Sequence, residues 1–164
     1  INFYNSSLPH YIAYLLRQFR IPADCLTIEI TEGVMMDKRP ETLEVICAVR
    51  ELGVGLSMDD FGTGFSCLSR LAHLPMTELK IDQSFMRDLS DGSKMKAIAT
   101  TVVKIGQSLH QTVVAEGVET EQQRNQLQEL QCDIAQGYLY SRALNAVALA
   151  GWLQSRPRQD ESYA

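Results

Sequence analysis

Carboxylate side chains stand near the ends of several short apolar runs in the sequence. Glu29, Asp59, Asp60 and Glu116 take such positions, and Asn2 lies early in the first run. If these carboxylates packed together without counter-charge, they would repel one another. Two divalent cations would relieve the repulsion, and hard oxygen ligands favour magnesium, manganese or calcium over zinc. The residue types therefore indicate a two-metal site, which can stabilise both the attacking and the leaving oxygen of a phosphoryl displacement.

A lysine and a glutamine take similar positions in two further runs. Lys80 lies within "ELKID", and Gln136 stands near the end of "CDIAQG". A lysine beside a metal site can orient water or neutralise charge in the transition state. The alternative interpretation is a surface lysine whose stem lies along apolar neighbours.

The segment after Asp60 reads "FGTGFS" and contains Gly62 and Gly64. Glycine permits backbone conformations that are closed to other residues, so this loop could approach a phosphate closely. It has neither the GxGxxG of a dinucleotide site nor the GK[ST] of a P-loop. Two other interpretations stay open: Ser66 begins a short helix, or the loop is a mobile element at a dimer contact.

Alternating strands and helices must position these residues. Runs rich in β-formers occupy residues 1–4, 26–31, 54–59, 78–82, 112–117 and 132–137, and helical patterns occupy residues 8–19, 40–52, 67–73, 93–109, 120–130 and 145–154. Pro40 suits a first helical turn, and Thr120 with Gln123 forms a capping-box pattern. Strict alternation predicts βαβ units and a mostly parallel sheet.

Two architectures fit this alternation, a doubly wound sheet and a β/α barrel, and both gather the carboxyl ends of their strands on one face. Six strand–helix units in 164 residues amount to about three quarters of a barrel. The polar strand ends are therefore expected to converge on one rim.

Composition restricts the class of protein. The chain is 45% hydrophobic and 21% charged, with a net charge of −5, which is typical of one globular domain and disfavours a nucleic-acid polymer as partner. No apolar run reaches the roughly 18 residues of a membrane helix, and no secretory leader is visible. The four cysteines form no CxxC pair and lie in apolar surroundings, which favours buried free thiols in a reducing compartment. We expect a cytoplasmic domain that is a piece of a longer polypeptide.

Five ordered motifs carry a family resemblance: "EITEG" (29–33), "DDFGTGFSCLSRL" (59–71), "LKIDQSF" (79–85), "VVAEGVET" (113–120) and "QGYLYSRAL" (136–144). With these motifs the chain resembles the EAL domains, phosphodiesterases that act on cyclic di-GMP. The similarity extends over residues 1–153 and leaves a polar tail at 154–164. Within the family it is most similar to output domains of multidomain sensors, including the haem-based oxygen-sensing phosphodiesterase.

The resemblance implies an incomplete TIM-like β/α barrel, with about six of the eight strand–helix units, that hydrolyses one phosphodiester bond of cyclic di-GMP to give linear pGpG. It implies two Mg²⁺ or Mn²⁺ ions, with Ca²⁺ binding but inhibiting. The implied metal ligands are Asn2, Glu29, Asp59, Asp60 and Glu116; the implied catalytic residues are Lys80, Glu116 and Glu119; Gln136 and Asp60 bind substrate; Glu32, Gly62 and Gly64 stabilise the loop.

Three departures from the family pattern qualify the resemblance. The Glu-Ala-Leu segment is absent, Tyr4 replaces a serine, and Ala143 replaces a proline. An alternative is therefore a catalytically silent module that binds cyclic di-GMP or a protein partner, and a third is another two-metal phosphodiesterase. The expected partners are a second copy, through the loop and helix at 59–71, and an upstream sensor or GGDEF-type domain.

Overall fold

The centre of the molecule is a parallel sheet. The computed structural model describes residues 3–35, 39–62, 71, 73–90 and 92–155, apart from the side chains of Glu32 and Met35. The strands are β1 (Thr27–Thr31), β2 (Gly55–Phe61), β3 (Glu78–Ile81), β4 (Thr112–Ala115) and β5 (Ile134–Ala135), paired in that order and all parallel. A doubly wound sheet reverses its strand order at a switch point. Because this order follows the chain without reversal, the fold is an incomplete TIM-like barrel.

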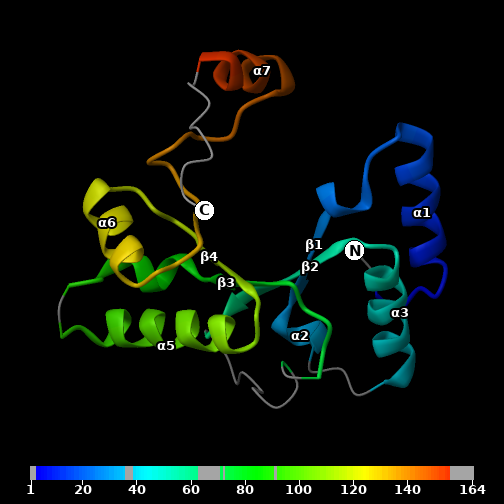
Figure 1. Cartoon of the computed structure of the whole chain (residues 1–164), viewed down its shortest axis with the longest axis horizontal. Coiled ribbons are helices and arrows are strands. Elements are labelled where there is room, and N and C mark those ends of the chain that lie inside the picture. Colours follow the sequence, from blue (N-terminus) through cyan, green and yellow to red (C-terminus); the bar gives the residue numbers. More distant parts are fainter. Residues whose placement is uncertain (1–2, 36–38, 63–70, 72, 91, 156–164) are drawn as a thin grey trace.

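Helices follow the strands and cover the sheet (Figure 1). They are α1 (Leu8–Phe19), α2 (Glu32–Met35), α3 (Pro40–Glu51), α5 (Lys94–Ser108), α6 (Glu121–Glu129) and α7 (Ala146–Ser155), with 3-10 turns η1 (Ala23–Cys25) and η2 (Gln83–Arg87). Helices α1, α2 and α3 lie towards β1 and β2, α5 and α6 lie beyond β3 and β4, and α7 stands apart (Figure 1).

The expected helix starts are confirmed at two positions. Pro40 is the first residue of α3, where its missing N–H has no intrahelical partner to lose. The Thr120 side chain accepts from the Gln123 N–H, and Gln123 reaches back to the N–H of Thr120, so the capping box is complete. These starts fix α3, which lies between β1 and β2 in the chain, and α6, which follows β4.

Side-chain alternation separates the core from the functional face. In β1, Ile28 and Ile30 are buried whereas Thr27, Glu29 and Thr31 are exposed. The other central strands also bury apolar side chains, which join those of α3 and α5 in one cluster: Leu56, Met58, Leu79, Ile81, Val113, Val45, Val49, Ala99 and Val103. Because successive strand residues point to opposite faces, the residues between these apolar positions turn towards the inside of the barrel.

The prediction of a strand at 1–4 is wrong for Phe3 and Tyr4, which form a turn. The Asn5 side chain accepts from the Ser7 N–H at 2.9 Å, and the Asn5 carbonyl accepts from Leu8 at 3.0 Å, so the chain bends directly into α1. Phe3 is nevertheless buried. The apolar character of this run therefore reflects packing and not strand pairing.

The bounds of three elements and the state of the cysteines can also be compared with the sequence predictions. The helix expected at 67–73 lies mostly outside the described residues, and α2 was not predicted. The strand expected at 132–137 shortens to the two residues of β5. Cys25, Cys47 and Cys132 are free thiols, as expected, but the expectation that they are buried is wrong for Cys25, which is exposed, and Cys47 and Cys132 are only partly buried. Within the described residues, no helix is long and apolar enough to cross a membrane.

Candidate active site

Lys80 contacts two carboxylates from the neighbouring strands β1 and β2 and a third from the residue that follows β4. Its Nζ lies 2.6 Å from Glu29 Oε1, 3.1 Å from Asp59 Oδ1 and 2.6 Å from Glu116 Oε1. Strand register places them together: Glu29 pairs with Ser57, two residues before Asp59, and Lys80 pairs with Val114, two residues before Glu116. One lysine therefore links β1, β2, β3 and the residue that follows β4.

Lys80 is a buried cation, with a side chain that is 6% exposed. Burial alone would lower the pKa of Lys80, but hydrogen bonds to Glu116, Glu29 and Asp59 outweigh it and raise the pKa well above the ordinary lysine value. The ammonium therefore stays charged and holds the three carboxylates in place. The interpretation of Lys80 as a surface lysine is wrong.

Asp59 and Asp60 are neighbours in sequence and both join the site. In a regular strand, consecutive side chains point to opposite faces. Here the register of β2 against β3 shifts between Met58 and Phe61, and Asp60 has a φ of 57°. This irregularity breaks the alternation, so that one carboxylate oxygen each from Asp59, Asp60 and Glu116 lies within 4.8 Å of the others.

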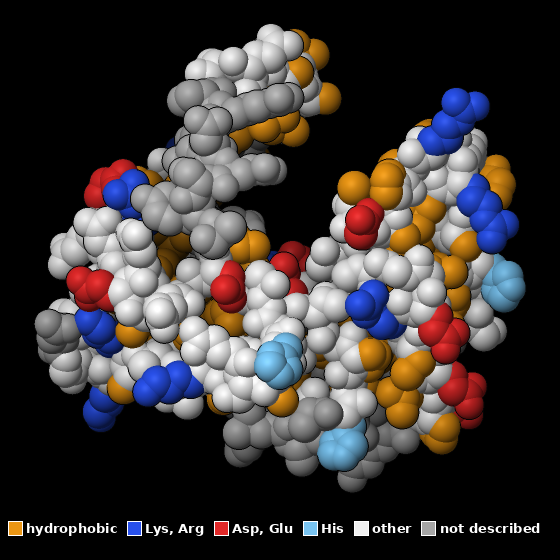
Figure 2. Space-filling model, viewed as in Figure 1, with side chains coloured by type: hydrophobic (Ala, Val, Ile, Leu, Met, Phe, Trp, Pro, Cys, Tyr) orange, Lys and Arg blue, Asp and Glu red, His pale blue; other side chains and the backbone are white. Residues whose placement is uncertain are grey.

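The cluster fits divalent cations. Partial burial raises the pKa of Asp60, and the nearby charges of Asp59, Asp82 and Glu116 raise it further. Three carboxylates, those of Glu29, Asp59 and Glu116, contact a single ammonium, and Asp60 adds a fourth beside Asp59 and Glu116, so negative charge remains in excess. Hard oxygen donors with uncompensated charge are the ligand set that Mg²⁺, Mn²⁺ and Ca²⁺ prefer. Figure 2 shows acidic side chains within the hollow between α7 and α1.

Asp82 is a neighbour of the cluster that sequence reasoning did not assign to the site. It caps η2 by accepting from the Ser84 N–H at 2.9 Å. Burial opposes ionisation of Asp82, but hydrogen bonds from Ser84 and Asp60 lower its pKa overall. Its position after β3, in the same run as Lys80, was the signal in the sequence that could have identified it.

A cavity of about 260 Å³ adjoins the carboxylates and shares Glu116 with them. Glu119, Gln136, Gln83 and Tyr138 line it. The guanidinium of Arg142 lies 4.4 Å from the centre of the Tyr138 ring, which supports this wall of the cavity. Sequence reasoning missed Gln83 and Tyr138, although both lie inside quoted motifs. The cavity places a space for a polar ligand directly beside the acidic cluster.

The remaining predicted residues take different positions. Gly62 follows β2 with a φ of 96°, and a Cβ there would lie 3.3 Å from the Phe85 ring. The backbone of Glu32 begins α2, whereas its side chain lies outside the described part. Asn2 and Gly64 are outside the described residues. Glu29, Asp59, Asp60, Lys80 and Glu116 form the cluster, and Glu119 and Gln136 line the cavity.

Comparison with known proteins gives concordant matches. Residues 1–143 match the family model described as "EAL domain". The chain is 44% identical over 155 residues to the oxygen sensor protein DosP of Escherichia coli K12, a match that covers 94% of this chain and 19% of that protein. The chain thus spans less than a fifth of that relative's length. The expected similarity to an oxygen-sensing family member is confirmed.

Two solved structures share the fold. The PaMucR phosphodiesterase in complex with c-di-GMP is 37% identical, with a TM-score of 0.83 over 90% of this chain and 60% of that chain. The manganese and cy-diGMP complex of BlrP1 from Klebsiella pneumoniae is 34% identical, with a TM-score of 0.74 over 82% of this chain and 35% of that chain.

Proposed function

Because the chain belongs to the EAL domain family, we propose that it forms the major part of a catalytic domain that hydrolyses one phosphodiester bond of cyclic di-GMP to linear pGpG. The observation that carries the proposal is the convergence of Glu29, Asp59 and Glu116 on Lys80, with Asp60 beside Asp59 and Glu116. The c-di-GMP bound to PaMucR and the manganese and cy-diGMP bound to BlrP1 support the same substrate and class of metal.

Two divalent cations, Mg²⁺ or Mn²⁺, would be held by Glu29, Asp59, Asp60 and Glu116, with Asn2 as a further ligand. When bound, they would supply Lewis-acid activation of water and neutralise charge on the phosphoryl group. Ca²⁺ would bind the same oxygens and inhibit.

The chain's own residues position the reactants. Lys80 holds three carboxylates at hydrogen-bond distance and keeps a positive charge beside them. Glu116 belongs both to the cluster and to the adjoining cavity, so a ligand in the cavity reaches the carboxylates. Glu119 and Gln136 contact that ligand, and the Gln136 amide offers it both a donor and an acceptor. Glu32, Gly62 and Gly64 are proposed to steady the loop after β2.

The proposed partners extend beyond these residues. We propose a domain at 1–153 with a tail at 154–164, a dimer through residues 59–71, and an upstream sensor or GGDEF-type domain. Residues 63–70 and 72 lie outside the described part, so the dimer proposal rests on the sequence alone. We propose the same phosphodiesterase activity for the longer protein because this chain belongs to the EAL domain family.

Chromatography of the nucleotides tests the proposal. The chain is incubated with cyclic di-GMP and Mn²⁺ beside two variants, Asp59→Asn in the cluster and Glu44→Gln, which removes an exposed carboxylate from α3. We expect pGpG from the parent chain and from Glu44→Gln, and at least about 100-fold less from Asp59→Asn. Binding of cyclic di-GMP without any pGpG would contradict the proposal and identify the silent binding module.

A further inference from the structure

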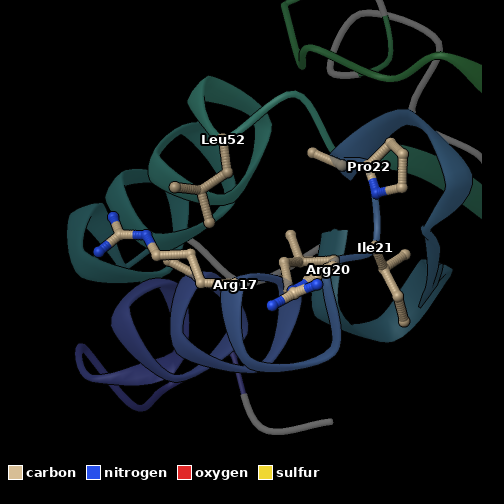
Figure 3. Close-up of a pocket in the computed structure, with 8 residues that line it drawn as sticks. Arg17, Arg20, Ile21, Pro22 and Leu52 are labelled. Atoms are coloured by element: carbon tan, nitrogen blue, oxygen red, sulfur yellow. The ribbon is translucent and has the colours of Figure 1, made fainter.

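A second hollow lies away from the carboxylates, between the carboxyl end of α1, η1 and the carboxyl end of α3 (Figure 3). Its volume is about 410 Å³, and its apolar lining includes Leu16, Ile21, Pro22 and Leu52. Ile21 is 46% exposed. Small-molecule sites are typically hollows of this size, mostly apolar, with a few polar groups that orient the ligand.

The polar groups of this hollow are two arginines. Arg17 lies in the last turn of α1, and Arg20 follows the helix in a left-handed conformation with a φ of 54°. This conformation directs the chain back so that the Ile21 N–H bonds the Leu16 carbonyl at 2.9 Å. Both arginines are exposed and border the hollow; in Figure 3 the Arg20 guanidinium turns towards Arg17, whereas the Arg17 guanidinium points away from Arg20, towards α3.

Neither guanidinium is neutralised within the described part of the chain. Helix α1 contains no aspartate or glutamate, and no hydrogen bond or ion pair joins the Arg17 or Arg20 side chain to a described residue. One basic side chain in a last helical turn is accounted for by the helix dipole. The helix dipole accounts for Arg17 in this way. It gives no reason for a second positive charge, that of Arg20, beside the exposed apolar lining of the hollow.

The hollow is at the opposite end of the strands from the active-site cluster. Pro22 and Ala23 precede β1, and Leu52 precedes β2, whereas Glu29 and Asp59 lie towards the carboxyl ends of the same strands. Along the strands, Glu29 lies about 7 Å beyond the first residue of β1 and Asp59 about 13 Å beyond the first residue of β2. An anion in the hollow is therefore clear of the acidic cluster, which would repel it.

We propose that this hollow binds a small amphipathic anion, a carboxylate or a phosphate monoester that carries a short apolar chain. The Arg20 guanidinium pairs with the anionic head, and the exposed Arg17 side chain rotates to join it, since the planar forks of both groups match carboxylate and phosphate oxygens. The apolar chain lies against Leu16, Ile21 and Leu52 and covers them from water. The proposal does not depend on the phosphodiesterase activity.

Isothermal titration calorimetry of the full chain with octanoate and with octyl phosphate tests the inference, with octanol as the uncharged probe. We expect saturable binding at one site per chain for at least one of the two anions, and none for octanol. Arg17→Gln with Arg20→Gln should weaken binding at least 10-fold, because each charged hydrogen bond contributes substantially. Lys94→Gln with Lys104→Gln removes the same charge from exposed positions on α5 and should leave binding unchanged.

A second variant tests the apolar part independently. Ala13 also lines the hollow, and Ala13→Phe should fill it and abolish binding while both arginines remain. Circular dichroism confirms that each variant is folded. Equal binding by the arginine variant, equal binding of octanol, or no binding of either anion would overturn the proposal. Association with phosphatidylglycerol vesicles but not with the two free anions would also overturn it and point to a membrane surface instead.

Discussion

Replacing Lys80 by methionine removes the positive charge from the centre of the cluster while keeping a side chain of similar length. The parent lysine lies within 3.1 Å of oxygens from Glu29, Asp59 and Glu116. Without it, these carboxylates face one another with no cation between them. We therefore expect Lys80→Met to lower the free energy of unfolding when divalent ions are absent.

The exposure of the carboxylates limits how far Lys80→Met lowers the free energy of unfolding. Removing one partner of a fully buried ion pair costs about 3–5 kcal/mol. Here the side chains of Asp59 and Glu116 are each 22% exposed and that of Glu29 is 56% exposed, so water screens part of the repulsion. We expect a loss of about 2 kcal/mol, which for a chain of this size lowers the melting temperature by about 4–8 °C.

Divalent cations should reverse part of this loss. The variant has one positive charge less beside the same carboxylates, so Mn²⁺ should raise its melting temperature more than that of the parent chain. Thermal unfolding followed by circular dichroism in EDTA and in Mn²⁺ measures both effects. Lys104→Met, at an exposed position on α5, is the control and should change stability by less than about 0.5 kcal/mol. Equal melting of Lys80→Met and the parent chain in EDTA would refute this reasoning.

Three further predictions concern the scaffold. Burial raises the pKa of the Cys132 thiol to about 11, so iodoacetamide at pH 8 should label the exposed Cys25 in the native chain and Cys132 only after unfolding, as peptide mass spectrometry would show. Gly106→Ala places a Cβ against β4 and should cost about 1–3 kcal/mol in urea unfolding; Gly151→Ala, which meets no neighbour, should not destabilise. Thr120→Ala removes the α6 capping bond and should cost about 1 kcal/mol in the same assay; an unchanged midpoint would contradict that role.

Local signals in the sequence were sufficient to predict many of the helix starts and strand faces. Pro40 marks a helix start because it has no N–H to leave unpaired in the first turn, and the Thr120–Gln123 pair marks another through hydrogen bonds between near neighbours. Alternation within "LTIEIT" separates buried Ile28 and Ile30 from Glu29. The order of elements then predicts that strand ends meet on one rim, since parallel strands share a direction.

The rest depends on contacts that no local pattern encodes. The convergence of Asp59 and Asp60 requires the irregularity of β2, which contradicts regular strand alternation. The three contacts of Lys80 join strands up to 51 residues apart, so their distances follow from sheet register and not from spacing. Phe3 shows the converse error: its β-forming residue type was taken as a sign of a strand, whereas the structure buries its side chain from a turn.

The most direct test of the central claim is to locate the cations themselves. We would crystallise the chain with Mn²⁺ and cyclic di-GMP and record anomalous diffraction at the manganese edge. The account predicts two manganese peaks coordinated by oxygens of Glu29, Asp59, Asp60 and Glu116, with the nucleotide extending into the cavity lined by Glu119 and Gln136. Manganese peaks elsewhere, with Lys80 still closing the space between the carboxylates, would contradict the account.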